Sequence, residues 1–210
     1  MKIINSIYLI VFTLWSGVLF IQGSVDTTMK SHNYTVFNRK VDFSNGVAHL
    51  NAQDRDGILW LNNSNFKNGT IEFDVKGKDL QGQSFVGLAF HGQDNETFDG
   101  IYFRPFNFKN PERKSHSVQY ISMPDNDWST LREAYPGKYE NEINPLPADV
   151  NDWFHVKVVI NSPKILVYVN NSTSPTLSVD KISKRQEGKL GLWVGHRSEG
   201  WFRNLKLKAE

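Results

Sequence analysis

The 210-residue sequence contains no cysteine. Disulfide bonds are therefore excluded, and so is a lipid anchor attached through cysteine. Exported proteins are usually free to form disulfides, so an exported chain of this kind depends on its packed core alone for stability. Phe, Trp and Tyr make up 13% of the residues, and because each aromatic side chain buries a large area, they are able to supply such a core.

Other features are scarce as well. The formal net charge is only +2, from 24 basic and 22 acidic residues, which argues against the concentrated basic surface of a nucleic-acid-binding protein. After the N-terminal segment, no apolar run reaches the ~20 residues of a membrane-spanning helix. We find no internal repeat of fixed period, no nucleophile elbow, no phosphate-binding Gly loop and no His-x-x-x-His spacing.

The N-terminus has the pattern of a secretory signal peptide. Lys2 precedes an apolar run over residues 7–20, which is followed by Ile21-Gln22-Gly23 before Ser24, with small residues at the expected cleavage site. The run is short for a bilayer span, although an uncleaved anchor is the alternative interpretation. We expect residues 1–23 to be a signal peptide, residues 24–35 a flexible lead-in and residues 36–210 a single domain. The leader predicts a secreted or periplasmic protein with no membrane partner after cleavage.

The rest of the chain reads as strands. Short aromatic and β-branched runs are bounded by Gly, Asn, Asp or Pro and recur every ~8–12 residues. Asn45-Gly46 between two alternating runs predicts a β-hairpin. Over residues 70–75, apolar and acidic side chains alternate, as in a half-buried strand. Ten or eleven such runs predict an all-β fold, a two-sheet antiparallel β-sandwich.

One region, residues 122–152, has little strand character. It contains Trp128 and Tyr135 and four prolines. Residues 128–134 are expected to form one or two helical turns that stop before Pro136. A loop of this length in a compact domain is usually functional.

Several sequence segments occur in an order that resembles that of a known family. NGTIEFDVKG, FVGLAF, GIYFRP, DWFHVKVVI and GKLGLWVG follow one another as in concanavalin A-like lectin/glucanase domains. The chain looks most like the laminin-G-type and 3-keto-disaccharide hydrolase (DUF1080-like) branch, over about residues 36–208. The resemblance implies a jelly-roll of two antiparallel sheets, one curved so that its concave face often holds sugars. These motifs are mostly structural, and a shared fold does not determine function.

A polar group of side chains is the main binding hypothesis. Alternation places Ile101 and Phe103 on one face of a strand and Tyr102 and Arg104 on the other. Gln119 belongs to the next strand along the chain. Arg and Gln side chains supply donors and an acceptor that suit sugar hydroxyls or a carboxylate. We expect Tyr102, Arg104 and Gln119 to project together into an open hollow roofed by the segment around Trp128.

Three further side chains complete the ligand-binding candidates. Trp128 and Tyr135 are expected to stack on a sugar ring, and the alternative is that they only pin the long loop to the sandwich. His91 ends a strand, where a histidine that is merely hydrogen-bonded is the alternative.

A catalytic acid pair is incomplete. Glycoside hydrolysis generally needs two carboxylates about 5–9.5 Å apart. Glu72 and Asp74 match the first two positions of the Glu-x-Asp-x-(x)-Glu pattern found in glucanases of family 16, but Lys76 or Gly77 stands where the second Glu belongs. A solvent-facing acidic pair is the alternative. The weak catalytic candidates are Glu72, Asp74, Asp99 and Glu133.

Two acidic clusters bear on metal binding. Residues 94–96 and residues 125–127 each carry the carboxylate and amide oxygens that Ca²⁺ takes as ligands. Neither has an EF-hand pattern, and ordinary turn chemistry is the alternative. We therefore assign no metal-ligating residue and expect no cofactor, with Ca²⁺ left as an open alternative.

The leading hypothesis from the sequence is an exported carbohydrate- or glycan-binding domain. The alternative is a glycoside hydrolase of the 3-keto-disaccharide hydrolase type that acts on oligosaccharides with acids drawn from different strands. A third interpretation is a surface-adhesion domain with a flat face. Whether the protein is an enzyme stays open at this point.

Overall fold

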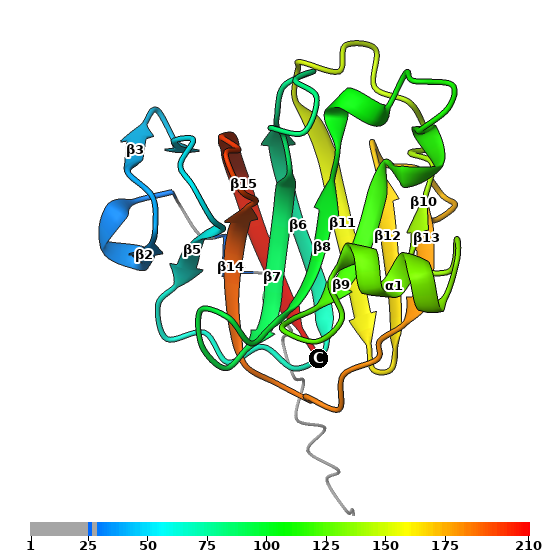
Figure 1. The fold of residues 1–210 in the computed structure, drawn as a ribbon. Coiled ribbons are helices and arrows are strands. Elements are labelled where there is room, and N and C mark those ends of the chain that lie inside the picture. The colour runs from blue at the N-terminus through cyan, green and yellow to red at the C-terminus, as the bar shows by residue number, and fades with distance from the viewer. Residues whose placement is uncertain (1–24, 27–28) are drawn as a thin grey trace, which may run out of the picture.

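The computed structural model describes residues 25–26 and 29–210, so the predicted signal peptide lies outside the described residues. The described chain forms a sandwich of two antiparallel sheets (Figure 1). The predicted all-β sandwich is therefore confirmed. No helix in the described part of the chain is long and apolar enough to cross a membrane.

One sheet has eight strands. Its order is β13-β12-β11-β6-β15-β4-β3, and β1 pairs with β15 beside this path. The strands are β1 (Val25–Asp26), β3 (Val41–Ser44), β4 (Val47–Leu50), β6 (Gly69–Lys76), β11 (Phe154–Asn161), β12 (Lys164–Val169), β13 (Leu177–Asp180) and β15 (Gly200–Ala209).

The other sheet has seven strands in the order β10-β9-β8-β7-β14-β5-β2. The strands are β2 (Tyr34–Phe37), β5 (Gly57–Leu61), β7 (Val86–Gly92), β8 (Asp99–Phe103), β9 (Val118–Ser122), β10 (Glu140–Asn141) and β14 (Lys189–Val194). The helices are η1 (Ser31–Asn33), η2 (Pro105–Asn107), η3 (Lys114–His116) and α1 (Trp128–Ala134). In Figure 1, α1 lies beside β9 on the outer side of this sheet.

The core lies between the sheets and follows from the period of two along each strand. In β6 every second side chain is fully buried, including Phe73, while the intervening ones are partly exposed. Ile101 and Phe103 of β8 belong to the same central cluster, as predicted. Each fully buried side chain of this size contributes roughly 1.5–3 kcal/mol from the hydrophobic effect. A second, smaller cluster lies on the outer face of the seven-stranded sheet and includes Tyr102 and Trp193.

Two local predictions are confirmed. Asn45 and Gly46, with φ of 50° and 75°, join β3 to β4, which fits the type I′ hairpin that this dipeptide favours. Helix α1 covers the predicted residues, begins after Asp127, whose side chain accepts from the Thr130 N–H, and ends before Pro136.

The N-terminal segment differs from the flexible lead-in expected over residues 24–35. Met29 is buried in the central cluster, and Tyr34 starts β2, which pairs with β5. The hydroxyl of Tyr34 donates to the sulfur of Met29. The sequence showed no such strand because the alternation of β2 is weak, with only its first residue buried. Strand β10, inside the long loop, was also not predicted.

Candidate functional site

One row of residues crosses the whole seven-stranded sheet on its outer face. The backbone pairing aligns Phe37, Ile58, Trp193, Gly87, Tyr102, Gln119 and Glu140, one from each strand. These seven residues are here called the floor row. It brings together side chains from strands that are far apart in the sequence, and aromatic ones occupy three of its places.

Gly87 lets the two central aromatic rings of the floor row approach. A Cβ at this position would lie 2.1 Å from the Ile101 carbonyl oxygen and 2.6 Å from the Tyr102 Cα. Without that Cβ, the rings of Tyr102 and Trp193 meet at 5.1 Å between centroids, tilted by 44°. A bare strip of backbone flanked by aromatic side chains results.

Three adjoining hollows lie over the floor row. The central one, about 210 Å³, is lined by Asp56, Tyr102, Trp128 and Trp193 among others. It shares Asp56 and Met123 with a hollow of about 440 Å³ at one end. It shares Phe85 and Trp128 with a hollow of about 240 Å³ at the other. Together the three are called the sheet groove.

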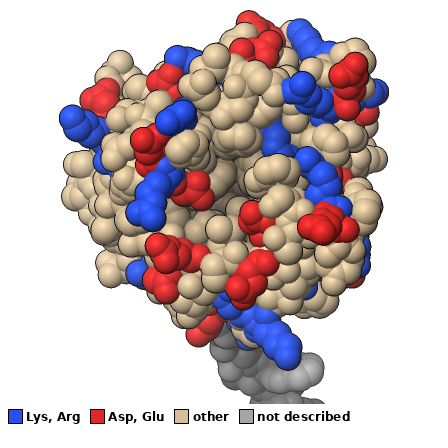
Figure 2. Space-filling view, viewed as in Figure 1, with Lys and Arg blue, Asp and Glu red and all other residues tan. Residues whose placement is uncertain are grey.

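Figure 2 shows this face hollowed near its centre. Basic side chains lie to the right of the hollow, acidic ones lie below it, and its left side carries both acidic and basic side chains. The face is therefore not the flat surface expected of the adhesion interpretation.

Tyr102, Arg104 and Gln119 do come together on one face. Arg104 donates to the Tyr102 hydroxyl and, at 3.4 Å, to Gln119 Oε1. They are not an open patch, however, because each side chain is at most 4% exposed. Gln119 Nε2 donates to the carbonyls of Tyr120 and Tyr139. Tyr102 and Arg104 line the sheet groove, whereas Gln119 supports it from below and ties the long loop to β9.

Helix α1 supplies the outer wall of the groove. Trp128, 45% exposed, lines two of the three hollows and stacks with the guanidinium of Arg132 at 4.9 Å. Tyr135 is equally exposed, but its ring packs edge-on against Tyr139 and under Lys138, and it lines none of the three hollows. Of the two predicted stacking residues, only Trp128 therefore faces the groove.

Asp56 is the carboxylate that the sequence analysis missed. It lines both the central hollow and the larger one. Burial raises the pKa of Asp56 above its usual value, although the charge of Arg39 opposes this rise. The nearby Trp193 N–H also lowers this pKa, but its buried Nε1 reaches no partner in hydrogen-bonding geometry in the described chain. No local motif marks Asp56, which sits in a polar turn before β5.

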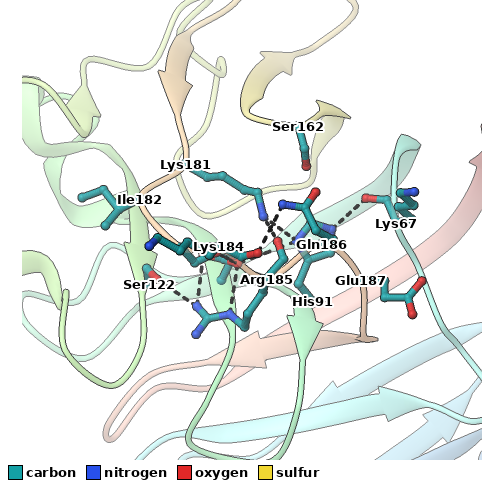
Figure 3. A network of polar contacts seen from close by, with 12 residues as sticks. Lys67, His91, Ser122, Ser162, Lys181, Ile182, Lys184, Arg185, Gln186 and Glu187 are labelled. Atoms are coloured by element: carbon teal, nitrogen blue, oxygen red, sulfur yellow. Dashed lines mark hydrogen bonds and ion pairs between the residues drawn. The ribbon is translucent and has the colours of Figure 1, made fainter.

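His91 and Asp99 lie away from the groove, in a buried network at one end of the sandwich. His91 Nε2 contacts the Lys67 carbonyl at 2.7 Å, and its Nδ1 lies 3.7 Å from Asp99. In Figure 3, Lys181 and Arg185 point toward the same network from the segment after β13. Both predicted site residues are fully buried, so the network holds this segment to the sheets.

The other predicted acids are dispersed. Glu72 and Asp74 lie on the outer face of the eight-stranded sheet, where His155 lies 2.8 Å from Asp74 and 3.5 Å from Glu72. Glu133 is exposed on α1. Neither Glu72, Asp74, Asp99 nor Glu133 lines the sheet groove. The carboxylates that do line it are Asp56, Glu96 and Asp127.

The two acidic clusters form turns. Asp94 Oδ1 accepts from the N–H groups of Glu96 and Thr97, and Asp127 caps α1. In the part of the chain that the structure describes, no group of three or more His, Asp or Glu side chains is arranged to hold a metal ion.

The fold and the groove define a concanavalin A-like sandwich with an aromatic hollow on one sheet. Residues 23–208 match the family model of the 3-keto-alpha-glucoside-1,2-lyase-like domain, and the chain belongs to this family. A search of curated proteins finds no match.

Solved structures share the fold at low identity. A carbohydrate-binding module, CBM66 from Bacillus subtilis, is 18% identical with a TM-score of 0.60, covering 83% of this chain and 95% of its own. The exoplasmic/lumenal domain of VIP36, in a Ca²⁺/Man3GlcNAc-bound form, is 10% identical with a TM-score of 0.60, covering 90% and 89%. A native glycosidic hydrolase is 13% identical with a TM-score of 0.60, covering 89% and 96%. The chain thus has the fold of carbohydrate-binding modules, lectins and glycosidic hydrolases.

Proposed function

We propose that the chain binds a carbohydrate in the sheet groove. The observation that carries this proposal is the floor row with its hollow, in which Tyr102, Trp193 and Trp128 surround a strip of bare backbone. Sugar rings present apolar C–H faces that stack on aromatic side chains, while a few polar groups orient the hydroxyls. Asp56 and Trp193 both line the central hollow, where the carboxylate and the indole N–H supply an acceptor and a donor beside the aromatic rings.

Titration calorimetry with neutral gluco-, manno- and fructo-oligosaccharides tests this proposal. We expect at least one series to bind and Trp128→Ala to weaken its binding about tenfold, since one stacking side chain is worth about 1–1.5 kcal/mol. Tyr135→Ala is the matched control, because Tyr135 is as exposed as Trp128 but faces away from the groove. Equal effects of the two substitutions would contradict the proposal, and so would a failure of these neutral series and of acidic oligosaccharides alike to bind.

A second candidate function is cleavage of the bound saccharide, with Asp56 in place of the acids expected from sequence. The raised pKa of Asp56 in a partly enclosed hollow favours it, because a general acid has to keep its proton near the working pH. Incubation with a 3-keto-α-glucoside and chromatography of the products tests this function. Asp56→Asn should then abolish product formation by at least 100-fold while calorimetry still detects binding; wild-type protein that releases no product would exclude cleavage of this substrate.

We also propose, on the leader sequence alone, that the protein is secreted or periplasmic. In an exporting bacterial host, N-terminal sequencing of the exported protein should start at Ser24. Retention of residues 1–23 on a membrane-associated product would favour the uncleaved anchor.

A further inference from the structure

The two ends of the sheet groove differ in charge. The hollow of about 240 Å³ beside α1 is lined by Arg104, Arg113, His116 and Arg132, and no carboxylate belongs to its lining. The opposite hollow contains Asp56 and Glu96 with a single Arg55. The groove therefore runs from an acidic end to a basic end, which is here called the arginine end.

One of the three arginines at the arginine end, Arg132, is neutralised locally. Glu140, at the end of the floor row, accepts from Arg132 Nε and Nη2 at 2.9 and 2.6 Å. The same carboxylate lies 2.9 Å from His116 Nδ1. Glu140 does not line the hollow itself, and this bidentate pairing leaves its charge already neutralised.

Arg104 and Arg113 have no acidic partner of this kind in the described chain. Among the described residues neither has a carboxylate within 4 Å. The Arg104 side chain is only 4% exposed. It donates hydrogen bonds to the Tyr102 hydroxyl, the Gln119 amide oxygen and the His116 carbonyl, all of which are neutral acceptors. Buried charges in proteins are normally paired with an opposite charge. Burial is the main cause that lowers the pKa of Arg104, and the nearby Arg132 charge also lowers it, whereas Tyr102 and the more distant charge of Glu140 raise it.

A buried acceptor next to these arginines points to the same conclusion. Asn107 Nδ2 donates to the His116 carbonyl, which orients the amide group. Its Oδ1, also buried, has no hydrogen-bond partner in the described part of the chain. Asn107 lines the hollow. The arginine end thus combines two cations without a counter-ion and an acceptor that is free for a hydroxyl donor.

We propose that the arginine end binds the anionic group, a carboxylate or a sulfate, of an acidic saccharide whose rings lie along the aromatic part of the groove. This inference rests on the proposed carbohydrate binding and narrows its ligand class. The guanidinium groups of Arg104 and Arg113 hold the anion, and Asn107 Oδ1 accepts from an adjacent hydroxyl. Arg132, already paired with Glu140, positions Trp128 above the site.

The test compares three probes by calorimetry: an oligogalacturonate, its fully methyl-esterified form and a sulfated oligosaccharide of similar length. The ester keeps the sugar chain but removes the charge. We expect the acid to bind at least tenfold more tightly than its ester, with an affinity that falls as salt is added. A preference for the sulfated probe would identify sulfate rather than carboxylate as the anion.

Two single substitutions locate the anion. Arg113→Gln removes an exposed side chain that makes no hydrogen bond or ion pair to the described residues, so the fold should be kept and affinity for the acid should fall about 3–10-fold. Lys184→Gln is the matched control, because it also removes an exposed positive charge but at a position that lines none of the three hollows. It should leave the affinity unchanged. Arg104→Lys, which keeps the charge but loses the planar fork, should weaken the acid and not the ester.

The possible results distinguish failure of the anionic site from failure of carbohydrate binding as a whole. Equal binding of acid and ester, or equal losses in Arg113→Gln and Lys184→Gln, overturns the anionic site and leaves carbohydrate binding standing. Failure of every saccharide, neutral or acidic, overturns both.

Discussion

At the scale of single residues, the charge of Asp99 is maintained by its neighbours. Burial by itself would raise the pKa of this carboxyl group. The hydrogen bonds that the Ser183 and Tyr120 hydroxyl groups donate, the nearby His91 and the charge of Arg185 together outweigh that effect and lower the pKa to about 2. A lowered pKa in the folded state means that the ionised carboxylate stabilises the fold at neutral pH.

Asp99→Asn should therefore lower the free energy of unfolding at pH 7 by about 2 kcal/mol. The wild-type advantage is fully present above pH ~4 and disappears as the pH falls through about 2, so the two proteins should converge there. Urea unfolding at pH 7 and at pH 2.5 measures the difference. Asp125→Asn, at an exposed carboxylate, is the control; a difference that stays constant with pH would show that Asp99 acts by packing alone.

A second residue-scale contrast concerns the arginines. The guanidinium groups of Arg104 and Arg132 both lie near the Trp128 ring, at 5.8 and 4.9 Å from its centroid. Only Arg132 has a carboxylate partner. The same residue type thus has a positioning role in one place and an unneutralised charge in the other, and burial and pairing decide which.

At the scale of elements, α1 is short and depends on its cap. Asp127 Oδ1 accepts from the Thr130 N–H at 2.8 Å and from the Ser129 hydroxyl. Seven residues form too short a helix to be stable in isolation. The cap and the packing of Leu131 therefore hold Trp128 and Arg132 in place over the groove.

Asp127→Ala should cost about 1 kcal/mol of stability and weaken saccharide binding, because it frees the helix that carries Trp128. Asp127→Asn retains an acceptor for the Thr130 N–H and should restore both properties. Thermal unfolding and calorimetry measure them. Loss of binding in Asp127→Asn without loss of stability would instead show that the carboxylate contacts the ligand directly.

At the scale of the whole molecule, the core and the groove lie on opposite faces of the seven-stranded sheet. Phe202 of β15 is fully buried between the sheets and packs against Phe73 at 6.4 Å between ring centroids. It takes no part in the sheet groove. Stability and ligand affinity should therefore be separable.

Phe202→Ala should lower the free energy of unfolding by about 3–5 kcal/mol and leave the saccharide affinity unchanged at temperatures where the protein stays folded. Chemical unfolding and calorimetry on one preparation test this. Val36→Ala, at an exposed hydrophobic side chain, should change neither. A parallel fall in affinity for Phe202→Ala would show that the groove is coupled to packing across the sheet.

The long loop shows both what was predicted and what was missed. One or two helical turns were predicted over residues 128–134, the span of α1, with Pro136 as the local stop signal, whereas the capping role of Asp127 came only from the structure. Strand β10 has two residues and exists only through its pairing with β9, so nothing in its own sequence marks it. The helix that forms the groove wall was thus predictable from local sequence, whereas the strand pairing that attaches the long loop to the sheet was not.

Within a strand, the sequence by itself determined which side chains share a face, because orientation alternates with every residue. That is why Tyr102 and Arg104 were predicted on the side opposite Ile101 and Phe103. The tertiary structure alone decided which strands became neighbours and in what register. Only that arrangement placed Trp193 beside Gly87 and Tyr102, brought Asp56 to the hollow and covered Arg104, because pairing between distant segments depends on the packing of the whole sandwich.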